Sequence, residues 1–534
     1  MLYTAAMHND PSHLPDDSAQ LRDLLAAFKL DLEKSQEKIH HLEERIRILQ
    51  NELFGRKSEK HYPEDHRQLP IFEARADDAA PPGQPGNIVI VAHSRKKSGR
   101  KPLPENLPRA EIIHDLPEEE KVCACGAVLS RIGQDICEKL DYIPAKMRVL
   151  RHIRLKYACK SCEGVESDEP TIKIAPPPAQ LIPKSMVTEG LLAHIVVSKF
   201  ADALPLYRQQ KIFARLGVDL SRATMANWAI GAAQRCSPLI ALFEDAIRLG
   251  PLINIDETPL QVLNEPGRSN TSQSYMWVFC GGQVEQPVYL YRYHPTRSGQ
   301  VALGFLQDYG GYVQSDDFSG YDHLDKKQIR GHLGCWAHAR RKFVEVVKAR
   351  KKVRGKNQNP KGLADEALDF IGTIYLIEKQ AREDGLSPDK IHALRREKAK
   401  PVLDQFRTWL ERTKLLTPPK GLLGIAIGYA LSNWQKLIIY LEDGRLRPDN
   451  NVAENAIRPF VLGRKNWLFA GHPDGAAAGA VFFSLIETAK ANGLEPFTYL
   501  RHIFEKLPLI KNPDHYRLLL PWAVDHAILN CPRL

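Results

Sequence analysis

Apolar residues recur with a heptad period near the start of the chain. Within residues 17–60, one apolar series has a spacing of seven residues, and a second series lies three positions after members of the first. The first series is Leu25, Leu32, Ile39, Ile46 and Leu53, and the second is Phe28, Leu42 and Leu49, with Ser35 as the polar interruption. Filled a and d positions predict a coiled coil. We expect the helix to pair with another copy or a partner; packing on its own domain is the alternative.

Residues 61–110 show no period and are rich in Pro, Gly, Asp and Ala, which predicts a flexible linker. Its second half is basic, with six Lys or Arg against Glu105 alone between His93 and Arg109. Such a segment suits either an extended arm in a DNA minor groove or a solvated tether. Residues 111–165 form the next unit, in which the alternating residues 141–158 predict two strands.

Two cysteine pairs flank this alternating stretch. Cys123 and Cys125 form CACG, and Cys159 and Cys162 form CKSC. Four thiolates at the tips of hairpins can hold one tetrahedral Zn²⁺, so we predict a zinc-binding β module. The first pair is one residue shorter than C-x-x-C, and four buried thiols are the alternative. The other cysteines have no partner spacing and are expected in the core: Cys137, Cys236, Cys280, Cys335 and Cys531.

Residues 166–248 are predicted to be a helical region that contains a helix-turn-helix. One amphipathic helix covers residues 206–216, Gly217 and the turn VDLS follow, and Ser221 can cap a second helix at 222–233. In such motifs the N-terminal part of the second helix enters the major groove of DNA. Here that part would present Arg222, Thr224, Met225 and Asn227. A plain helical hairpin is the alternative.

Strand patterns take over in residues 249–361. Three strand-like segments, a helix at 297–309 and further strand–helix units predict a mixed sheet covered by helices. Residues 340–361 carry ten Lys or Arg against Glu345 alone, which indicates a phosphate-binding rim or a solvated face. The remaining segments, 362–445, 446–495 and 496–534, are predicted to be mainly helical.

Three acidic residues lie at positions where a buried carboxylate is energetically unfavourable unless a cation meets it. Asp256 ends a buried strand, Asp316 ends another, and Glu454 lies on a helix that begins near Asn451. Neighbouring carboxylates repel unless a divalent ion lies between them, so the set is a candidate magnesium site of the two-metal type. The adjacent Glu257 and Asp317 compete with the first two. Glu454 has two alternative roles, closing a capping box with Asn451 or pairing with Arg458.

Composition narrows the function classes. The chain has 534 residues with 74 Lys plus Arg against 64 Asp plus Glu, a net charge of +10, and 9 cysteines. Its longest apolar run, residues 475–486, is shorter than the ~18 residues of a membrane span, and the N-terminus lacks a signal-peptide pattern. A phosphate-cradling GxxxxGK[ST] loop is absent from the sequence. We therefore expect an intracellular protein that meets a polyanion.

Several fragments together carry a family resemblance. They are LFGRKSEK, GRKPLPENLPR, the region from CACG to CKSCEG, LPLYRQQKIFARLGVDLSRATMANW, DETPLQVL, VQSDDFSGYD, GCWAHARRKF and RPDNNVAENAIRPFVLGRKNWLFAG. Over nearly the whole chain the sequence resembles the large transposase of the insertion-sequence-66 family. The resemblance implies an RNase H-like catalytic domain, split by the helical insertion 362–445, with Asp256, Asp316 and Glu454 as its triad. The expected architecture is thus a multidomain α+β protein.

The resemblance also implies a reaction and its partners. A transposase binds the terminal inverted repeats of its element and cleaves and joins DNA with Mg²⁺ or Mn²⁺. The helix-turn-helix and the zinc module would recognise the ends, and the coiled coil would pair two or more copies. Residues expected to neutralise phosphates are Arg340, Arg341, Arg458, Arg464 and Lys465. Trp336 or Trp467 could stack on an unpaired base, although a core role suits each better.

Some expectations concern context. The protein would be bacterial, cytoplasmic and nucleoid-associated, would work on double-stranded DNA away from membranes, and could use accessory proteins of the same element. Two other functions remain open: a catalytically silent DNA-binding relic or repressor, and a metal-dependent nuclease that cleaves without joining.

Overall fold

The computed structural model describes residues 147–158, 172–316, 318–321, 329–351 and 361–525. It also describes five isolated helical positions: Lys29, Leu32, Ser35, Gln36 and Ile39. The rest of the predicted coiled coil at 17–60, the linker at 61–110, and Cys123, Cys125, Cys159 and Cys162 lie outside the described residues. The same holds for Asp317, Cys137 and Cys531.

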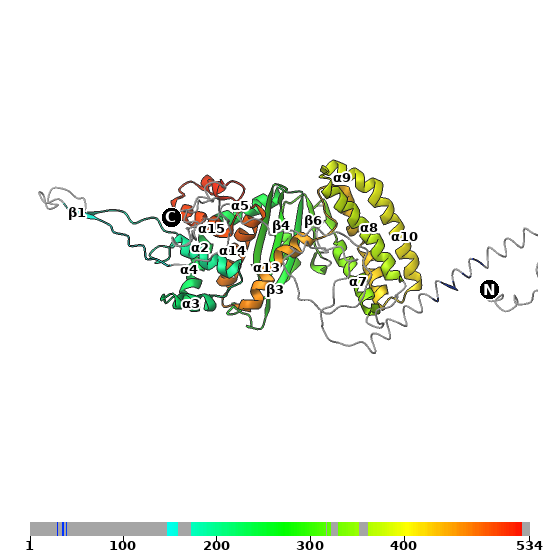
Figure 1. Cartoon of the computed structure of the whole chain (residues 1–534), viewed down its shortest axis with the longest axis horizontal. Helices are drawn as coiled ribbons and strands as arrows, with labels where there is room; N and C mark the ends of the chain where they lie inside the picture. Colours follow the sequence, from blue (N-terminus) through cyan, green and yellow to red (C-terminus); the bar gives the residue numbers. More distant parts are fainter. Residues whose placement is uncertain are drawn as a thin grey trace, which may run out of the picture.

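A six-stranded mixed sheet lies at the centre of the described chain, as the strand patterns predicted (Figure 1). Its order is β5-β4-β3-β6-β7, and β8 pairs with the end of β3. Neighbours β3, β4 and β5 are antiparallel, whereas β6 is parallel to β3 and to β7. The strands are β3 Leu252–Val262, β4 Gln273–Gln283, β5 Gln286–His294, β6 Tyr312–Gln314, β7 Gly331–Leu333 and β8 Phe469–Ala470.

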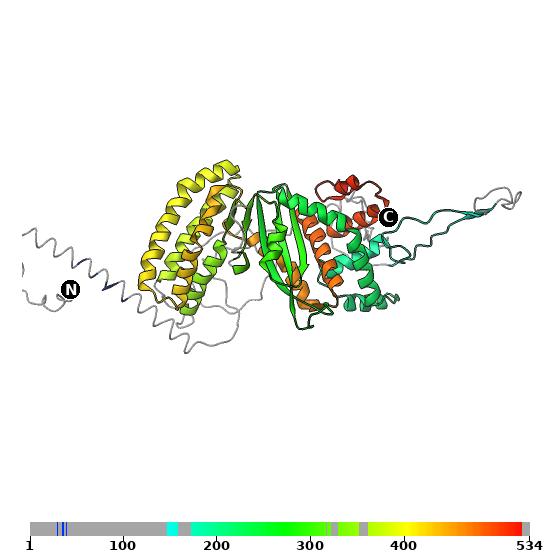
Figure 2. The same ribbon diagram turned by 180° about the vertical axis from the view of Figure 1, so that it is seen from behind.

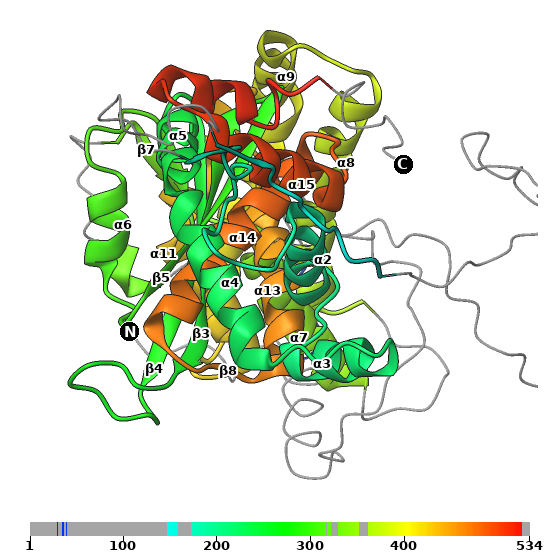
Figure 3. The same cartoon turned by 90° about the vertical axis from the view of Figure 1, so that its left-hand side faces the viewer.

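Two helical groups lie on opposite sides of this sheet (Figures 1 and 2). The first group shares a core with β3, β4 and β5, and α14 packs along β5 (Figure 3). Its helices are α2 Glu189–Phe200, α3 Leu206–Arg215, α4 Arg222–Arg235, α5 Ser237–Arg248, α13 Asn451–Trp467, α14 Pro473–Ala491 and α15 Pro496–Lys506. The short α6 Gly299–Phe305 connects β5 to β6.

The second group has a core of its own, which meets the sheet at Leu252, Tyr312 and Leu333. It contains α7 Trp336–Lys351, α8 Leu363–Glu383, α9 Pro388–Leu394, the π-helical turn Arg395–Ala399, α10 Lys400–Leu416, α11 Leu422–Ser432 and α12 Trp434–Ile438. Among the described helices no single one is long and apolar enough to span a membrane. One pair, Leu422–Ser432 with Trp434–Glu442, reaches the required length and apolar composition when the two are taken together, but it is bent by 64°.

Helices α3 and α4 follow one another with a short turn at 216–221, an arrangement that both the predicted helix-turn-helix and the alternative helical hairpin require. Gly217 has φ +78°, a conformation that side chains with a Cβ rarely adopt, and it ends the first helix. The Ser221 hydroxyl accepts the backbone N–H of Thr224 at 3.1 Å, so Ser221 caps α4 as expected. Arg222 and Asn227 are exposed and Thr224 is partly exposed. Met225 is fully buried in the first core, so its predicted presentation to DNA is wrong.

The alternating residues 141–158 do not pair as two strands of one hairpin within their described part. Only β1 Lys156–Ala158 is a strand there, and it pairs antiparallel with β2 Ile172–Ile174. The resulting ribbon projects from the body of the molecule (Figures 1 and 2). Apolar side chains along it, including Val149 and Ile153, are 94% and 75% exposed. The second strand therefore comes from beyond the second cysteine pair.

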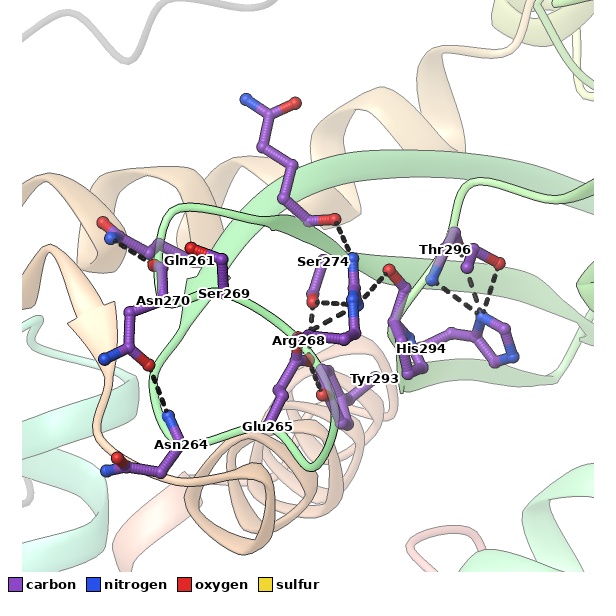
Figure 4. A network of polar contacts seen from close by, with 12 residues as sticks. Gln261, Asn264, Glu265, Arg268, Ser269, Asn270, Ser274, Tyr293, His294 and Thr296 are labelled. Atoms are coloured by element: carbon purple, nitrogen blue, oxygen red, sulfur yellow. Dashed lines mark hydrogen bonds and ion pairs between the residues drawn. The ribbon is translucent and has the colours of Figure 1, made fainter.

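A polar network stiffens the hairpin that joins β3 to β4 (Figure 4). The buried Glu265 accepts a hydrogen bond from Ser274 Oγ at 2.6 Å and pairs with Arg268 at 2.9 Å. Asn264 Nδ2 donates to the backbone oxygen of Gly471 at 3.1 Å. The far end of β3 is thereby attached to the chain that follows α13.

Candidate active site

The sheet register brings two of the predicted carboxylates to the same level of neighbouring strands. Asn254 on β3 pairs with Gln314 on β6 in parallel register. Asp256 and Asp316 each follow their paired residue by two positions, so they lie at the same level of the sheet. Asp316 follows the end of β6 as predicted, but β3 continues past Asp256 to Val262, so the prediction that Asp256 ends its strand is wrong. Their charges interact, because Asp316 contributes to raising the pKa of Asp256.

Glu454 reaches the same place from helix α13, which packs against β3 and β4. Its charge also raises the pKa of Asp256. The capping-box alternative is not realised: the residue before the helix is Asn450, and its side chain makes no capping bond. Two cationic or titratable partners of Glu454 lie on α7, where His338 Nε2 is 3.7 Å and Arg341 is 3.5 Å from its carboxylate.

Asp256 and Glu257 have different surroundings, which distinguishes the two competing residues. The Glu257 side chain is 1% exposed, and Arg297 binds its Oε1 at 2.6 Å. The hydroxyl of Tyr321 donates to the other Glu257 oxygen. Asp256 instead receives a backbone N–H bond from Glu257 at 2.8 Å and lies near Asp316 and Glu454. The Glu257 carboxylate is thus already bound by protein groups, which favours Asp256 as the ligand.

Burial and neighbouring negative charges both disfavour the ionised form of Asp256. Burial, together with the charges of Glu257, Asp316 and Glu454, raises the pKa of Asp256 from 3.8 to about 8. Arg297 lies 3.9 Å from Asp316 but is already engaged by Glu257. The three carboxylates therefore converge with too little cationic compensation, which is the condition that divalent cations relieve.

The donor set fits a divalent cation. Glu454 Oε1 is buried and has no hydrogen-bond donor among the described residues. Cys335, His338 and Glu454 also place one ligand atom each within 4.8 Å of one another. Burial raises the pKa of the Cys335 thiol to about 12, and that sulfur already accepts the backbone N–H of Asn450 at 3.2 Å. His338 is therefore the better addition to a carboxylate site.

Removing the Asp256 charge is expected to stabilise the protein in metal-free buffer. The folded pKa of about 8 exceeds the unfolded value near 3.9, so the folding free energy contributed by Asp256 declines as pH rises from about 4 to about 8. Asn does not titrate. At pH 8.5 we expect the free energy of unfolding of Asp256→Asn to exceed that of wild type by about 2 kcal/mol, and at pH 5 we expect the two values to be nearly equal. Thermal or urea unfolding in the presence of EDTA measures this.

The exposed Asp404→Asn is the matched control, since the Asp404 side chain is 65% exposed and no comparable charge crowding surrounds it. It should show no gain that grows with pH. An Asp256→Asn variant as unstable as wild type at pH 8.5 would contradict the crowding inferred for the three carboxylates.

The predicted phosphate-binding residues fall into two groups. Arg341, Arg458 and Lys465 are exposed near the carboxylates or along α13. Arg464 instead donates to Thr258 Oγ1 at 2.9 Å and to the backbone oxygen of Pro259, so it holds α13 to β3. Arg340 is partly buried, and that burial lowers its pKa.

Other residues of the predicted rim and the predicted stacking residues have structural contacts. Arg350, from the basic run, is 3% exposed and pairs with Asp365, which joins α7 to α8. Trp336 is fully buried, so a stacking role on a base is wrong for it. Trp467 is partly exposed and packs on Phe460. Cys236, Cys280 and Cys335 are buried as expected.

Comparison with known proteins then decides the family. A family model described as "Transposase IS66 family" matches residues 184–478, which include all three carboxylates. The chain belongs to this family. Models for the "zinc-finger binding domain of transposase IS66", the "IS66 C-terminal element" and the "Transposase C of IS166 homeodomain" match residues 120–163, 484–522 and 41–112.

Relatives of this IS66 family member match nearly the whole chain. "Uncharacterized protein y4jD" of Sinorhizobium fredii is 33% identical over 470 residues, which is 86% of this chain and 88% of the relative. "Uncharacterized protein y4hP" of the same organism is 30% identical over 508 residues, or 91% and 89% of the two chains. The family membership confirms the resemblance that the motifs carried.

Sequence reasoning missed several residues around the candidate site. His338 lies in the fragment GCWAHARRKF, which contributed to the resemblance, but no role was assigned to it. Its position three residues before Arg341 on a helix was the available signal, because residues three apart share a helix face. Arg297 and Tyr321 bind Glu257 and were also missed. Tyr321 ends a short 3-10 helix and lies in the fragment VQSDDFSGYD, whereas Arg297 lies between β5 and α6 in a segment without a comparable signal.

Proposed function

We propose that this IS66 family member is an active DNA transposase with an RNase H-like catalytic domain. It would bind the terminal inverted repeats of its element, cleave the DNA strand at each end and join the freed 3′ end to target DNA. The convergence of Asp256, Asp316 and Glu454 is the observation that carries this proposal. The sheet order supports the fold, with three antiparallel strands followed by two strands parallel to the first.

In this proposal Asp256, Asp316 and Glu454 hold Mg²⁺ or Mn²⁺, with His338 as an additional candidate ligand. Bound ions of this kind polarise a phosphodiester and supply an activated nucleophile. The protein's own groups do the positioning: Arg297 keeps the Glu257 carboxylate engaged, and Arg341 balances part of the charge on Glu454. The exposed Arg458 and Lys465 would bind phosphates of the DNA backbone.

Other parts of the chain would recognise DNA and partners. Arg222, Thr224 and Asn227 at the start of α4 would read the element ends in the major groove. Cys123, Cys125, Cys159 and Cys162 would hold a structural Zn²⁺, which the match to a zinc-finger model supports. Dimerisation through the coiled coil, help from accessory proteins and a nucleoid location belong to the same proposal.

The α4 residues give a prediction on DNA binding. We expect Arg222→Ala and Asn227→Ala each to weaken binding to end DNA about tenfold, in line with about 1–3 kcal/mol for a good base contact. Fluorescence anisotropy with labelled end and unrelated DNA at one salt concentration measures this. Arg235→Ala, at the exposed opposite end of α4, is the matched control for charge. Equal losses for Arg222→Ala and Arg235→Ala would show that α4 does not read the ends.

Product analysis tests the proposed reaction. Purified full-length protein is incubated with labelled DNA carrying the ends of its own element, target DNA, and Mg²⁺ or Mn²⁺. A transposase produces metal-dependent nicks at the ends and labelled target joined to the 3′ end. Cleavage without joining would instead identify a nuclease, and specific binding without either product in the presence of the element's accessory proteins would identify a repressor-like relic.

A further inference from the structure

Three buried amide side chains lie directly behind the three carboxylates. Asn254, Gln314 and Asn450 are 4%, 0% and 1% exposed. Asn254 precedes Asp256 by two residues on β3, and Gln314 precedes Asp316 by two residues at the end of β6. Asn450 precedes Glu454 by one helical turn, and its backbone oxygen accepts the N–H of Glu454 at 3.2 Å. Each amide is therefore next to a different carboxylate along the chain.

The amides bind one another across the three elements. Asn254 Nδ2 donates to Gln314 Oε1 at 2.9 Å and to Asn450 Oδ1 at 2.8 Å. Asn450 Nδ2 donates to the backbone oxygen of Ile255 at 2.9 Å, on the peptide that leads into Asp256. The Asn254 amide is thus a direct bridge between strand β6 and the start of helix α13.

Three further bonds fix the surroundings of this bridge. Gln314 Nε2 donates to the backbone oxygens of Gly334 at 3.1 Å and Arg447 at 3.0 Å, which precede α7 and α13. The N–H of Asn450 donates to Cys335 Sγ at 3.2 Å. Buried amides with satisfied donors hold a single geometry, because any displacement leaves a polar group unpaired in a site that water does not reach.

We propose that Asn254, Gln314 and Asn450 form a positioning network that sets the relative placement of the three metal-binding carboxylates. The inference rests on the proposed function, because it assigns the network to the metal site of that reaction. No covalent bond fixes the start of helix α13 relative to strands β3 and β6, so non-covalent contacts must set their relative positions. Residues that act on ligands through such outer contacts are expected to affect metal affinity about 10–100-fold.

The test measures metal affinity apart from catalysis. Mn²⁺ alone is titrated into DNA-free, full-length protein and followed by electron paramagnetic resonance, and thermal unfolding is recorded for each variant. We expect Asn450→Ala to weaken Mn²⁺ binding at least tenfold. Asn254→Ser, which keeps a small polar group in β3, is the second variant if Asn450→Ala folds poorly, and the same loss is expected.

A matched control separates positioning from general destabilisation. Asn492→Ala also removes an amide that donates to two backbone oxygens, those of Pro287 at 2.9 Å and Thr488 at 2.8 Å, at the C-terminal end of α14. It should lower the melting temperature while Mn²⁺ affinity stays within about twofold of wild type. Equal Mn²⁺ affinity in Asn450→Ala and wild type, or equal losses in Asn450→Ala and Asn492→Ala, would overturn the positioning role alone.

The wild-type titration distinguishes failure of the metal site from failure of the positioning network. If wild type binds Mn²⁺ and Glu454→Gln binds it more weakly, the metal site of the proposed function stands and the network variants decide the inference. If wild type binds no Mn²⁺ through these carboxylates, the metal site falls and the positioning role falls with it.

Discussion

Glu454→Gln is expected to reduce DNA strand cleavage and joining at least about a thousandfold, equivalent to about 4 kcal/mol of lost transition-state stabilisation. Glutamine is isosteric with glutamate, so the side chain still fits between α13 and α7. It lacks the negative charge that lies among Asp256, Asp316 and a bound cation. Gel analysis of labelled end DNA, with Mg²⁺ and with Mn²⁺, measures both steps.

Glu487→Gln is a suitable comparison for this substitution. Glu487 is on α14, its side chain is 13% exposed against 17% for Glu454, and it pairs with Lys490 rather than with the candidate site. We expect its cleavage rate to remain within about threefold of wild type. Cleavage that survives in Glu454→Gln would remove Glu454 from the triad and return the helix start to a structural role.

Arg395→Met is expected to lower the free energy of unfolding by about 3–5 kcal/mol. Arg395 is 2% exposed, and all five of its N–H groups are used. Two donate to the carboxylate of Glu378 at 2.7 Å, and three donate to the backbone oxygens of Tyr440, Asp443 and Leu446. Methionine fills much of the volume but leaves the Glu378 charge buried and unpaired.

Urea unfolding of Arg395→Met and of Arg407→Met separates this site from an ordinary ion pair. Arg407 is exposed and pairs with Glu411 at 2.9 Å one helical turn away, a type of pair whose loss costs about 0.3–0.5 kcal/mol. A loss below about 1 kcal/mol for Arg395→Met would contradict its role. We also expect lower cleavage activity, because the segment that Arg395 holds leads into α13 and Glu454.

The strands of the central sheet could be predicted because each has a distinctive pattern. Alternating or continuous apolar residues marked β3, β4 and β5, and the apolar Tyr312 and Val313 marked β6. Asp256 and Asp316 were recognisable because each follows directly on an apolar, strand-like segment. Asp256 could not be separated from Glu257 by sequence, since the separation depends on Arg297 and Tyr321, which approach from distant loops.

Burial on helices was predicted less well. Met225 was assigned to a surface on the basis of motif position, and base stacking was considered for Trp336 beside the favoured core role, although apolar neighbours three or four residues away pointed to the core. In α4 these neighbours are Trp228 and Ala229, and in α7 the neighbour is Ala339. The amide network could not be predicted at all, because its bonds depend on the register of β3 with β6 and on which of two adjacent asparagines begins α13.

The order in which the carboxylates occur along the chain has a consequence for synthesis on the ribosome. Glu454 follows Asp256 by 198 residues, with the whole second helical group between them. At about 5–20 residues per second, the last carboxylate is made roughly 10–40 s after the first. Helices α3 and α4 precede both in the chain, but α4 packs against α14, which is made after Glu454, so the candidate DNA-reading surface and the carboxylate site are both completed only when the chain is nearly finished.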